Sequence, residues 1–338
     1  MPDRATMLRR IVQAARDHPG LRAKAALGLV TQTLGPTDWV SGPGDDAAAI
    51  PLAGEHDVRL LAAGEALLPE FVAQDPFGAG VGAVIANVND IAAMGGRCLG
   101  IVDTMVASEP VARRILEGLR HAARLYDVPI VGGHLTIHDG PPALSAFAFG
   151  TASTTLSTRH AAPGQILLYA ANLHGHLHQR FPFYPSLDQR GARVQGDVAL
   201  LADLADAGYA VAAKDVSMAG LLGSLAMLLE PTSCGVTIDL DALPRPADVP
   251  LETWLGVFPS YGFLLCAPPE HTAACVSAFH ERNLTCAPVG TLDHSGHLRA
   301  RLGDTTALVL DLTTERVTGL GQPKGGSLRL ADPGQGRP

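Results

Sequence analysis

Positive charge is scarce in this chain of 338 residues, which holds 25 Lys and Arg residues against 33 Asp and Glu residues, for a formal net charge of −8. A nucleic-acid surface needs clustered Lys and Arg to neutralise phosphates, so this balance argues against a broad nucleic-acid interface. It leaves a bound nucleotide open, because backbone amides and a bridging metal ion can hold one. We therefore expect small-molecule partners and no nucleic acid.

Cysteine is also scarce, and no two cysteines form a CxxC pair. The five are scattered along the chain: Cys98, Cys234, Cys266, Cys275 and Cys286. This pattern is typical of reduced, mostly buried thiols in a reducing compartment. We expect a cytoplasmic protein.

Long apolar runs are missing as well. No window of about 18 uncharged apolar residues runs without interruption by Gly, Asn or Pro, so we expect no membrane partner. The first twenty residues have no long apolar stretch. Leu8, Ile11, Val12 and Ala15 follow helical spacing, which predicts an amphipathic helix and not a signal peptide.

The chain has ample material for buried cores, since 47% of its residues are hydrophobic and 17% are charged. At roughly 150 residues per domain the length suggests two domains, and a boundary is expected near residues 157–165. We expect an N-terminal helical segment over 1–40, a first domain over 41–156 and a second over 160–318. The Gly- and Pro-rich residues 319–338 are expected to form a frayed, flexible tail.

The first domain is predicted to be a compact α/β layer with the order β, β, α, β, α, β, β. Its helix over 75–94 is largely apolar and rich in small residues, which would let another element approach closely. The expected strands cover 47–52, 57–64, 99–107, 128–137 and 143–152, and a second, amphipathic helix covers 111–126.

The second domain is predicted to alternate strands and helices. Ser217 is the expected N-cap of a helix over 217–230. The other expected helices cover 197–208 and 271–283, and the expected strands cover 166–171, 209–216, 234–240, 262–268 and 284–292.

Several carboxylates lie in segments rich in small residues, where a bound metal ion would offset the cost of their negative charge. Asp45 and Asp46 are adjacent, and they form either a solvated turn or a grip on a divalent cation. Asp90 lies inside an apolar helix, where a carboxylate needs a donor or a metal ion as partner. Asp215 ends an apolar strand, where it can cap the next helix or hold a cation. Carboxylates drawn from several segments fit a site for Mg²⁺ and ATP.

Four segments then resemble the motifs of one superfamily, in the same order. "GPGDDAAAI" resembles the GDDAA segment of thiamine-monophosphate kinase, and "NVNDIAAMGG" is similar to the N-x-S-D-x-A-A-M-G helix of that kinase and of selenophosphate synthetase. "VGGHLT" takes the place of their G-G-D-T, and "KDVSMAGLLGSLAML" resembles the synthetase segment T-D-V-T-G-F-G-L-L-G. Over residues 45–235 the chain thus resembles the aminoimidazole ribonucleotide (AIR) synthase superfamily, as a divergent branch of unassigned substrate.

The resemblance implies a two-domain α/β (α+β) fold. The N-terminal ferredoxin-like sheet would form a barrel with that of a second copy in a homodimer, and the C-terminal domain would be α/β. ATP would lie in a cleft near the dimer interface, with Mg²⁺ held against its phosphates. The implied metal ligands are Asp45, Asp46, Glu65, Asp90 and Asp215, and the implied nucleotide-binding residues are Gly44, Asn87, Gly132, Gly133 and Lys214.

The chain departs from the motifs of its relatives at three positions. Glu65 is the nearest carboxylate where the kinase has an S-T-D strand end, His134 replaces the Asp of G-G-D, and Met218 replaces a second Asp after Asp215. Each change removes negative charge from the metal cage. His134 is interpreted either as a strand-end residue bonded to a neighbour or, with Asp215, as a catalytic residue that contacts phosphate or transfers a proton. Lys214 is either a phosphate-neutralising residue or a surface lysine.

Three further histidines alternate in "NLHGHLHQR": His174, His176 and His178. On a strand they would share one face and could hold Zn²⁺, whereas in a loop they are merely polar. We interpret the segment as a substrate-facing loop.

The function that these observations favour is a Mg²⁺-dependent enzyme that transfers phosphoryl from ATP to an oxygen of a small metabolite. In a synthetase-like reaction this step activates an amide or carbonyl oxygen for attack by nitrogen. Two alternatives stay open: a small-molecule kinase similar to thiamine-monophosphate kinase, and a non-catalytic nucleotide-binding regulator that has lost metal ligands.

Overall fold

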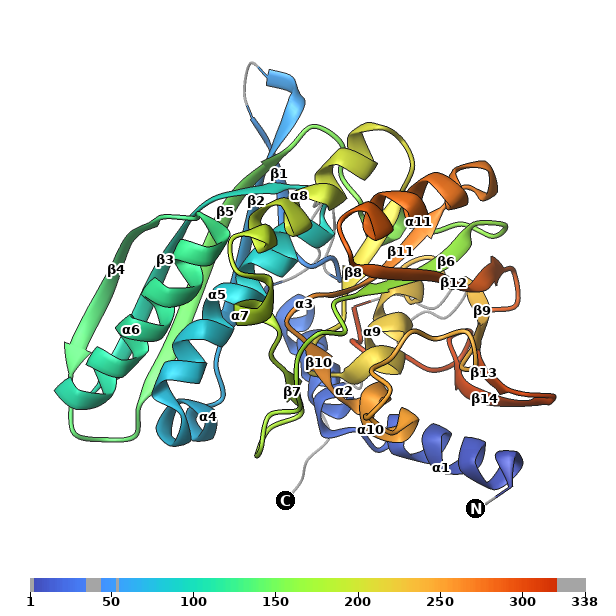
Figure 1. The fold of residues 1–338 in the computed structure, drawn as a ribbon, viewed down its shortest axis with the longest axis horizontal. Coiled ribbons are helices and arrows are strands. Elements are labelled where there is room, and N and C mark those ends of the chain that lie inside the picture. The colour runs from blue at the N-terminus through green and yellow to red at the C-terminus, as the bar shows by residue number, and fades with distance from the viewer. Residues whose placement is uncertain (1–2, 35–43, 53–54, 321–338) are drawn as a thin grey trace, which may run out of the picture.

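A computed structural model of the chain describes residues 3–34, 44–52 and 55–320. Two β-sheets organise it, a five-stranded sheet from the N-terminal half and a seven-stranded sheet from the C-terminal half (Figure 1). Helices pack on both sheets and between them. The predicted α/β architecture is therefore confirmed, while a barrel shared with a second copy is not visible in one chain.

The N-terminal sheet has the strand order β1-β2-β5-β3-β4. Its pairs are antiparallel except for β3 and β4, which run parallel. All five strands were expected: β1 (Ala48–Leu52), β2 (Glu55–Ala66), β3 (Arg97–Ala107), β4 (Ile130–Ile137) and β5 (Ala143–Ala152).

Helices α5 (Pro76–Ala93) and α6 (Glu109–Tyr126) cover one face of this sheet (Figure 1). They pack so closely that a Cβ on Gly80 would lie 2.2 Å from the carbonyl oxygen of Ile115. A Cβ on Gly118 would likewise lie 2.1 Å from the carbonyl oxygen of Phe77. The small residues of α5 thus permit the close approach that was predicted. A short helix before it, α4 (Pro69–Gln74), was not expected.

The C-terminal sheet has the strand order β14-β13-β9-β12-β6-β11-β8. Its central strands read as continuous apolar runs because helices cover both faces. The strands are β6 (Ile166–Ala171), β8 (Ala212–Asp215), β9 (Gly235–Asp239), β11 (Gly262–Ala267), β12 (Thr285–Asp293), β13 (His297–Leu302) and β14 (Thr305–Asp311). The hairpin of β13 and β14 was not expected, nor was the short parallel pair of β7 (Phe183–Tyr184) and β10 (Phe258–Pro259).

The remaining helices connect these strands. The α-helices are α7 (Leu187–Arg190), α8 (Arg193–Asp206), α9 (Gly220–Leu229), α10 (Leu251–Gly256) and α11 (Thr272–Glu281), and the 3₁₀ turns are η2 (Thr158–His160) and η3 (Pro269–His271). The N-cap predicted at Ser217 is wrong, because α9 begins three residues later and its N-cap is Ala219. Gly220 has a φ of +70°, so the backbone turns there before the helix proceeds, and the Ser217 carbonyl accepts from the Gly220 amide.

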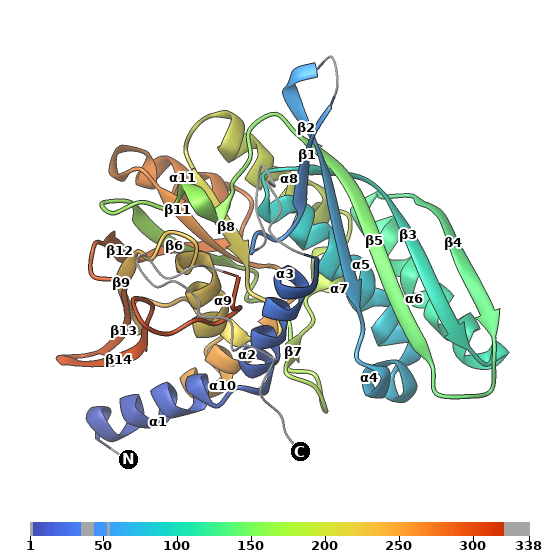
Figure 2. The same ribbon diagram turned by 180° about the vertical axis from the view of Figure 1, so that it is seen from behind.

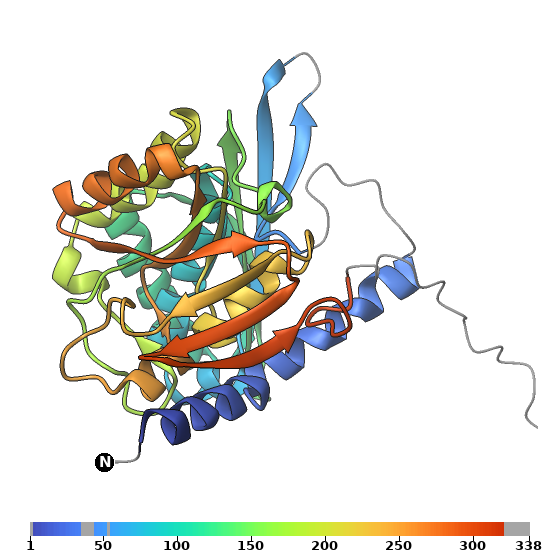
Figure 3. The same cartoon turned by 90° about the vertical axis from the view of Figure 1, so that its right-hand side faces the viewer.

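The N-terminal segment forms a chain of helices: α1 (Arg4–Arg16), α2 (Pro19–Lys24), the 3₁₀ turn η1 (Ala25–Leu27) and α3 (Gly28–Leu34). α1 packs along β13 and β14 at the edge of the C-terminal sheet (Figure 3). Its Leu8 and Ile11 are buried, as the predicted amphipathic pattern requires. Residues 35–40 of the expected segment, and most of the expected tail, lie outside the described residues.

None of the helices in the described ranges combines the length and apolar character that crossing a membrane requires.

Candidate nucleotide and metal site

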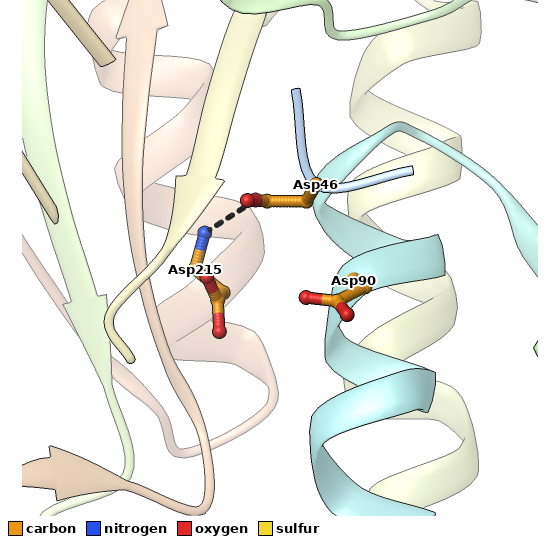
Figure 4. A group of neighbouring side chains, drawn as sticks. All are labelled: Asp46, Asp90 and Asp215. Carbon is orange, nitrogen blue, oxygen red and sulfur yellow. Dashed lines mark hydrogen bonds between the residues drawn. The ribbon is translucent and has the colours of Figure 1, made fainter. Parts of the chain in front are cut away.

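Three carboxylates that are far apart in the sequence meet between the two sheets. Oxygen atoms of Asp46, Asp90 and Asp215 all lie within 4.8 Å of one another. Figure 4 shows the three side chains gathered between α5 and the end of β8. They come from three of the four segments that carried the family resemblance.

Each carboxylate lies at or near the end of a different element. Asp90 lies near the C-terminal end of α5, on a helix that is buried along most of its length, and is itself 6% exposed. Asp215 is the last residue of β8, which pairs with β11 so that Phe263 lies opposite it. Asp46 lies in the bend just before β1. The helix end, the strand end and the bend converge on the same point.

Asp46 is bound by two consecutive residues of the β8 end. Its Oδ2 accepts a hydrogen bond of 3.0 Å from the backbone amide of Asp215 (Figure 4). Its Oδ1 accepts one from the ammonium of Lys214. Lys214 also lies 3.9 Å from the Asp215 carboxylate, and its side chain is 7% exposed. The surface-lysine reading of Lys214 is therefore wrong: it forms a buried ion pair.

Asp45 has a different role from its neighbour. Its carboxylate accepts from the Ser157 hydroxyl at 2.6 Å, the Thr158 amide at 2.8 Å and the Thr158 hydroxyl at 2.5 Å. It thereby holds the start of η2, which leads from the first sheet into the second. Asp45 lines the same cavity, but the metal role predicted for it is not supported, because its oxygens do not join those of Asp46, Asp90 and Asp215. Asp46 alone of the adjacent pair joins the carboxylate group.

Burial and mutual repulsion disfavour the charged forms of Asp90 and Asp215, and Lys214 only partly offsets this. Burial, followed by the negative charge of Asp46, raises the pKa of Asp215 to about 7, against the opposing effect of Lys214. Burial and then the charge of Asp215 raise the pKa of Asp90 well above its usual value. Burial also raises the pKa of Glu65. For Lys214, burial lowers the pKa, but attraction to Asp46 and Asp215 outweighs it and the net pKa is raised.

The three carboxylates provide a set of ligands that suits a hard divalent cation. Among the described residues, no hydrogen-bond donor serves the carboxylate of Asp90, although it is buried. An unpartnered buried carboxylate is costly, and a cation would supply the missing partner. The set consists of oxygen atoms alone, which Mg²⁺ prefers over the nitrogen and sulfur ligands typical of Zn²⁺.

A cavity of about 270 Å³ opens beside the carboxylates. Its polar wall includes Glu65 and Gly44, so the structure brings both of these predicted residues to the site. Gly44 has a φ of +114°, which side chains rarely adopt, and this turn precedes the two aspartates. The apolar lining of the cavity comes partly from both ends of the described chain: Leu27, Val30 and Leu320.

Lys24 is a site residue that sequence reasoning missed. It ends α2, lines the same cavity, and acts electrostatically on Glu65 and Asp215. Within the described residues it makes no ion pair within 4.0 Å, so its ammonium is available. A signal existed in the sequence, since the chain has three lysines and Lys24 is one of them. Nothing in the sequence indicated that α2 crosses the site.

Four predicted residues do not join the carboxylates within one chain. Asn87 is fully buried on α5, donates to the Ala83 carbonyl at 2.9 Å, and does not line the cavity. Gly132, Gly133 and His134 lie on β4, the outermost strand of the N-terminal sheet. Within a single chain the nucleotide and catalytic roles predicted for these residues are therefore not supported.

His134 instead faces away from α5 and α6. It pairs in register with Thr104, which is exposed, whereas the neighbouring Asp103 and Met105 are buried beneath the helices. Figure 2 shows this other face of β3, β4 and β5 with no described helix over it. Large apolar side chains are exposed there, among them Phe147 and Phe149. The His134 ring contacts the Thr136 hydroxyl at 3.3 Å.

The three alternating histidines lie in the loop between β6 and β7 and not on a strand. His178 lies 3.5 Å from Asp75, the N-cap of α5, whereas Asp90 is near the other end of that helix. At 1.5 Å per residue the two ends are roughly 22 Å apart. In the part of the chain that the structure describes, these histidines form no metal-ligand group. The substrate-facing interpretation is not supported, because the loop does not line the acidic cavity.

With this geometry established, comparisons with known proteins define the class of the chain. It belongs to the AIR synthase related family: the model of the N-terminal domain matches residues 44–152 and that of the C-terminal domain matches residues 187–303. The N-terminal helices lie outside both matches. The predicted superfamily is confirmed.

Among individual relatives, the chain is similar to an uncharacterised protein of Synechocystis (36% identical, 82% of this chain and 86% of that one). An uncharacterised protein of Methanocaldococcus jannaschii is 28% identical, over 92% and 99% of the two chains. A thiamine-monophosphate kinase of Rhodopirellula baltica is 28% identical over 69% and 77%. The PurL subunit of phosphoribosylformylglycinamidine synthase from a Bradyrhizobium strain is 26% identical, but the chain spans 40% of its length.

Solved structures share the fold. AaThiL complexed with AMPPCP and TMP has a TM-score of 0.64 at 18% identity, with 83% of this chain and 94% of that chain covered. PurL of Thermotoga maritima complexed with ATP has a TM-score of 0.70 at 17% identity, with 88% and 50% covered. These similarities confirm the two-domain α/β fold. At sequence identities this low they show the fold alone.

Proposed function

We propose that the protein is a Mg²⁺-dependent enzyme that transfers the terminal phosphoryl group of ATP to an oxygen of a small metabolite. One observation carries the proposal: Asp46, Asp90 and Asp215 meet beside a cavity in a chain of the AIR synthase related family. Two structural neighbours support it, since they are complexes with ATP and with AMPPCP.

In this proposal the carboxylates of the chain bind the cation and its lysines bind the phosphate groups. Asp46, Asp90 and Asp215 would hold Mg²⁺, which when bound neutralises phosphate charge and orients the phosphoryl group. Glu65 adds a carboxylate at the cavity wall. Lys24 and Lys214 bring two ammonium groups to the same cavity, where they would bind phosphate oxygens. Catalysis of this kind depends on positioning and on charge neutralisation more than on proton transfer.

Two versions of the reaction differ in the fate of the phosphorylated acceptor. In the synthetase-like version the phosphorylated amide or carbonyl oxygen is an intermediate that nitrogen attacks, and phosphate is released. In the kinase-like version the phosphorylated molecule is the product. The relatives include a PurL subunit and a thiamine-monophosphate kinase, so both versions have precedent in the family.

We also propose a homodimer formed through the uncovered face of the N-terminal sheet. The exposed apolar side chains on β3 and β5 support it, because monomers rarely leave such patches uncovered. His134 faces the same side, so its predicted catalytic role is retained only as a contribution to the site of the partner. The cytoplasmic location stays part of the proposal and is supported by the cysteines, all five of which are free thiols.

The alternative of a non-catalytic nucleotide-binding regulator is disfavoured by the cost of the buried carboxylates. Keeping Asp90 and Asp215 buried without a cation destabilises the fold, as their raised pKa values indicate. A protein that only bound nucleotide through backbone and lysine contacts would not need them.

Calorimetric titration of ATP, with and without Mg²⁺, tests the proposal first. We expect binding that depends on Mg²⁺ and is lost in Asp215→Asn, followed by ATP consumption in a screen of amides, carboxylic acids and phosphate esters that includes TMP and FGAR. Phosphorus NMR of the products separates the two versions. Tight Mg²⁺-independent binding with no ATP consumption under any acceptor would instead favour the regulator.

A further inference from the structure

The two lysines of the described chain lie in the one cavity that the carboxylates share. The chain has three lysines, Lys24, Lys214 and Lys324, and the first two line the acidic cavity. They differ in what they touch. Lys24 makes no ion pair within 4.0 Å among the described residues, whereas the ammonium of Lys214 touches Asp46 and lies 3.9 Å from Asp215.

The Lys214 ammonium therefore already lies beside Asp46 and Asp215, two of the ligands that a divalent cation would need. The side chains of Lys214, Asp46 and Asp215 are 7%, 4% and 8% exposed, so little water screens their charges. A divalent ion held by Asp46, Asp90 and Asp215 would lie close to this ammonium. Two positive groups at such a distance in a poorly hydrated site repel each other strongly.

We propose that Lys214 is a resident cation that keeps free divalent ions out of the carboxylate group until the polyphosphate of a nucleotide draws its ammonium away from Asp46. The inference rests on the proposed function and adds a rule to it: metal and nucleotide enter together. A lysine suits this role because its ammonium is compact and its four-carbon stem is flexible.

Polyphosphate changes the balance because it brings several negative charges into the same cavity. The ammonium then has phosphate oxygens to bind, and the Asp46 carboxylate becomes free for the metal ion. Each ligand thus favours the other, and by linkage the effect is the same whichever enters first. A purely structural ion pair between Lys214 and Asp46 would create no such coupling.

Equilibrium binding of Mn²⁺, followed by the electron paramagnetic resonance of the free ion, tests the inference without relying on activity. The full-length wild type, Lys214→Met and Lys24→Met are titrated with and without AMPPCP. Lys24→Met is the matched control, since it removes one positive charge from the same cavity but breaks no ion pair. Thermal unfolding of each variant verifies the fold.

Two effects of opposite sign are expected for Lys214→Met. It should bind Mn²⁺ without nucleotide at least about tenfold more tightly than the wild type, which lies within the usual range of coupling between two ligands. It should bind AMPPCP in the presence of Mn²⁺ about tenfold more weakly, because a phosphate contact is lost. Lys24→Met should change nucleotide-free Mn²⁺ binding by less than about threefold, because no contact to a metal ligand is broken.

Two outcomes overturn the inference, and they are distinct. If the wild type and Lys214→Met bind nucleotide-free Mn²⁺ equally well while Mn²⁺ and AMPPCP still bind together, the resident-cation role is wrong and the proposed function stands. If the wild type binds neither ligand under any condition, both fail. Should Lys214→Met not fold, Lys214→Gln keeps a hydrogen-bond donor for Asp46 without the charge, and the same two effects are required of it.

Discussion

The backbone amide of Asp215 donates a hydrogen bond of 3.0 Å to the carboxylate of Asp46, so the last residue of β8 is fastened to the bend before β1 (Figure 4). The two residues are 169 positions apart. Because the donor is a backbone group, the contact fixes the position of the β8 end whatever the side chain of Asp215 does. It joins the two sheets at the point where the carboxylates meet.

Asp45 should respond to substitution differently from the members of the carboxylate group. Asp215→Asn and Asp90→Asn should lower turnover by about 10²–10³-fold, comparable to the loss of one transition-state contact, and leave the fold intact. Asp45→Asn should keep turnover within about threefold but lower the free energy of unfolding by about 1–2 kcal/mol, since it weakens the hydrogen bonds that Asp45 accepts from Ser157 and Thr158 at the start of η2. Steady-state ATP consumption and urea unfolding measure the two effects. Full activity in Asp215→Asn would contradict the metal assignment.

The metal-free protein should lose stability as the pH rises from about 4 to about 7. The pKa of Asp215 is about 7 in the folded protein and near 3.8 when unperturbed, so in this window the folded state binds more protons than the unfolded state. Stability contributed by the protonated carboxyl is fully present below the lower value and is lost as pH passes the higher one. Urea unfolding with EDTA at several pH values measures it.

Asp215→Asn supplies the control for that profile, because every surface acid titrates identically in both proteins. The variant should be more stable than the wild type at pH 8 without metal, by about 1–4 kcal/mol at ~1.4 kcal/mol per pKa unit. At pH 4 the difference should nearly vanish, and excess Mg²⁺ at pH 8 should reverse its sign. A wild type that stays the more stable of the two at pH 8 in EDTA would show that burial does not penalise this carboxylate.

Gly20 should be a sensitive position in the N-terminal helices. A Cβ at Gly20 would lie 2.2 Å from the carbonyl oxygen of Met218, in the segment that follows Asp215. Gly20→Ala should therefore push α2 away from the site, costing about 1–3 kcal/mol of stability as overpacking does. The Michaelis constant for ATP should rise as well.

Gly28→Ala is the matched control, because a Cβ there meets its nearest atoms at 3.6 Å, an ordinary contact. It starts α3, where Ala is favoured over Gly, so stability should be unchanged or slightly higher. Equal kinetic constants for ATP in the Gly20→Ala and Gly28→Ala proteins would mean that α2 does not shape the site.

Light scattering should give twice the chain mass of 35.1 kDa for the wild type. Phe147→Glu places a charge on the uncovered face of β5, where Phe147 is 41% exposed, and should shift the protein to monomers. Leu308→Glu, a similarly exposed position on β14, serves as the control and should leave the mass unchanged. A wild-type protein that is monomeric at all concentrations tested would remove the basis for a partner role of His134.

Local pattern was enough to predict most elements of the fold. Three local sequence patterns appear where they were expected. They are the apolar runs of β6 and β11, the amphipathic spacing of α6 and the small residues of α5. The β13–β14 hairpin was missed because its strands are half exposed and mix polar with apolar residues, so they carry no continuous apolar run. The Ser217 cap was missed because the backbone turns at Gly220, where φ is positive and a Cβ would lie 2.5 Å from the Leu255 carbonyl oxygen, so the helix begins only there.

For the site, the sequence by itself determined which residue types are present and which motifs carry them, and those motifs mark Asp45, Asp46, Asp90 and Asp215 as candidate metal ligands. Only the tertiary structure showed that Asp45 binds the start of η2 while Asp46 joins Asp90 and Asp215, because the two side chains have different partners in space. It also decided that Lys24 lines the cavity and that His134 does not. Charge and hydrogen bonding act over a few ångströms in space, so which groups they join is settled by how distant segments pack.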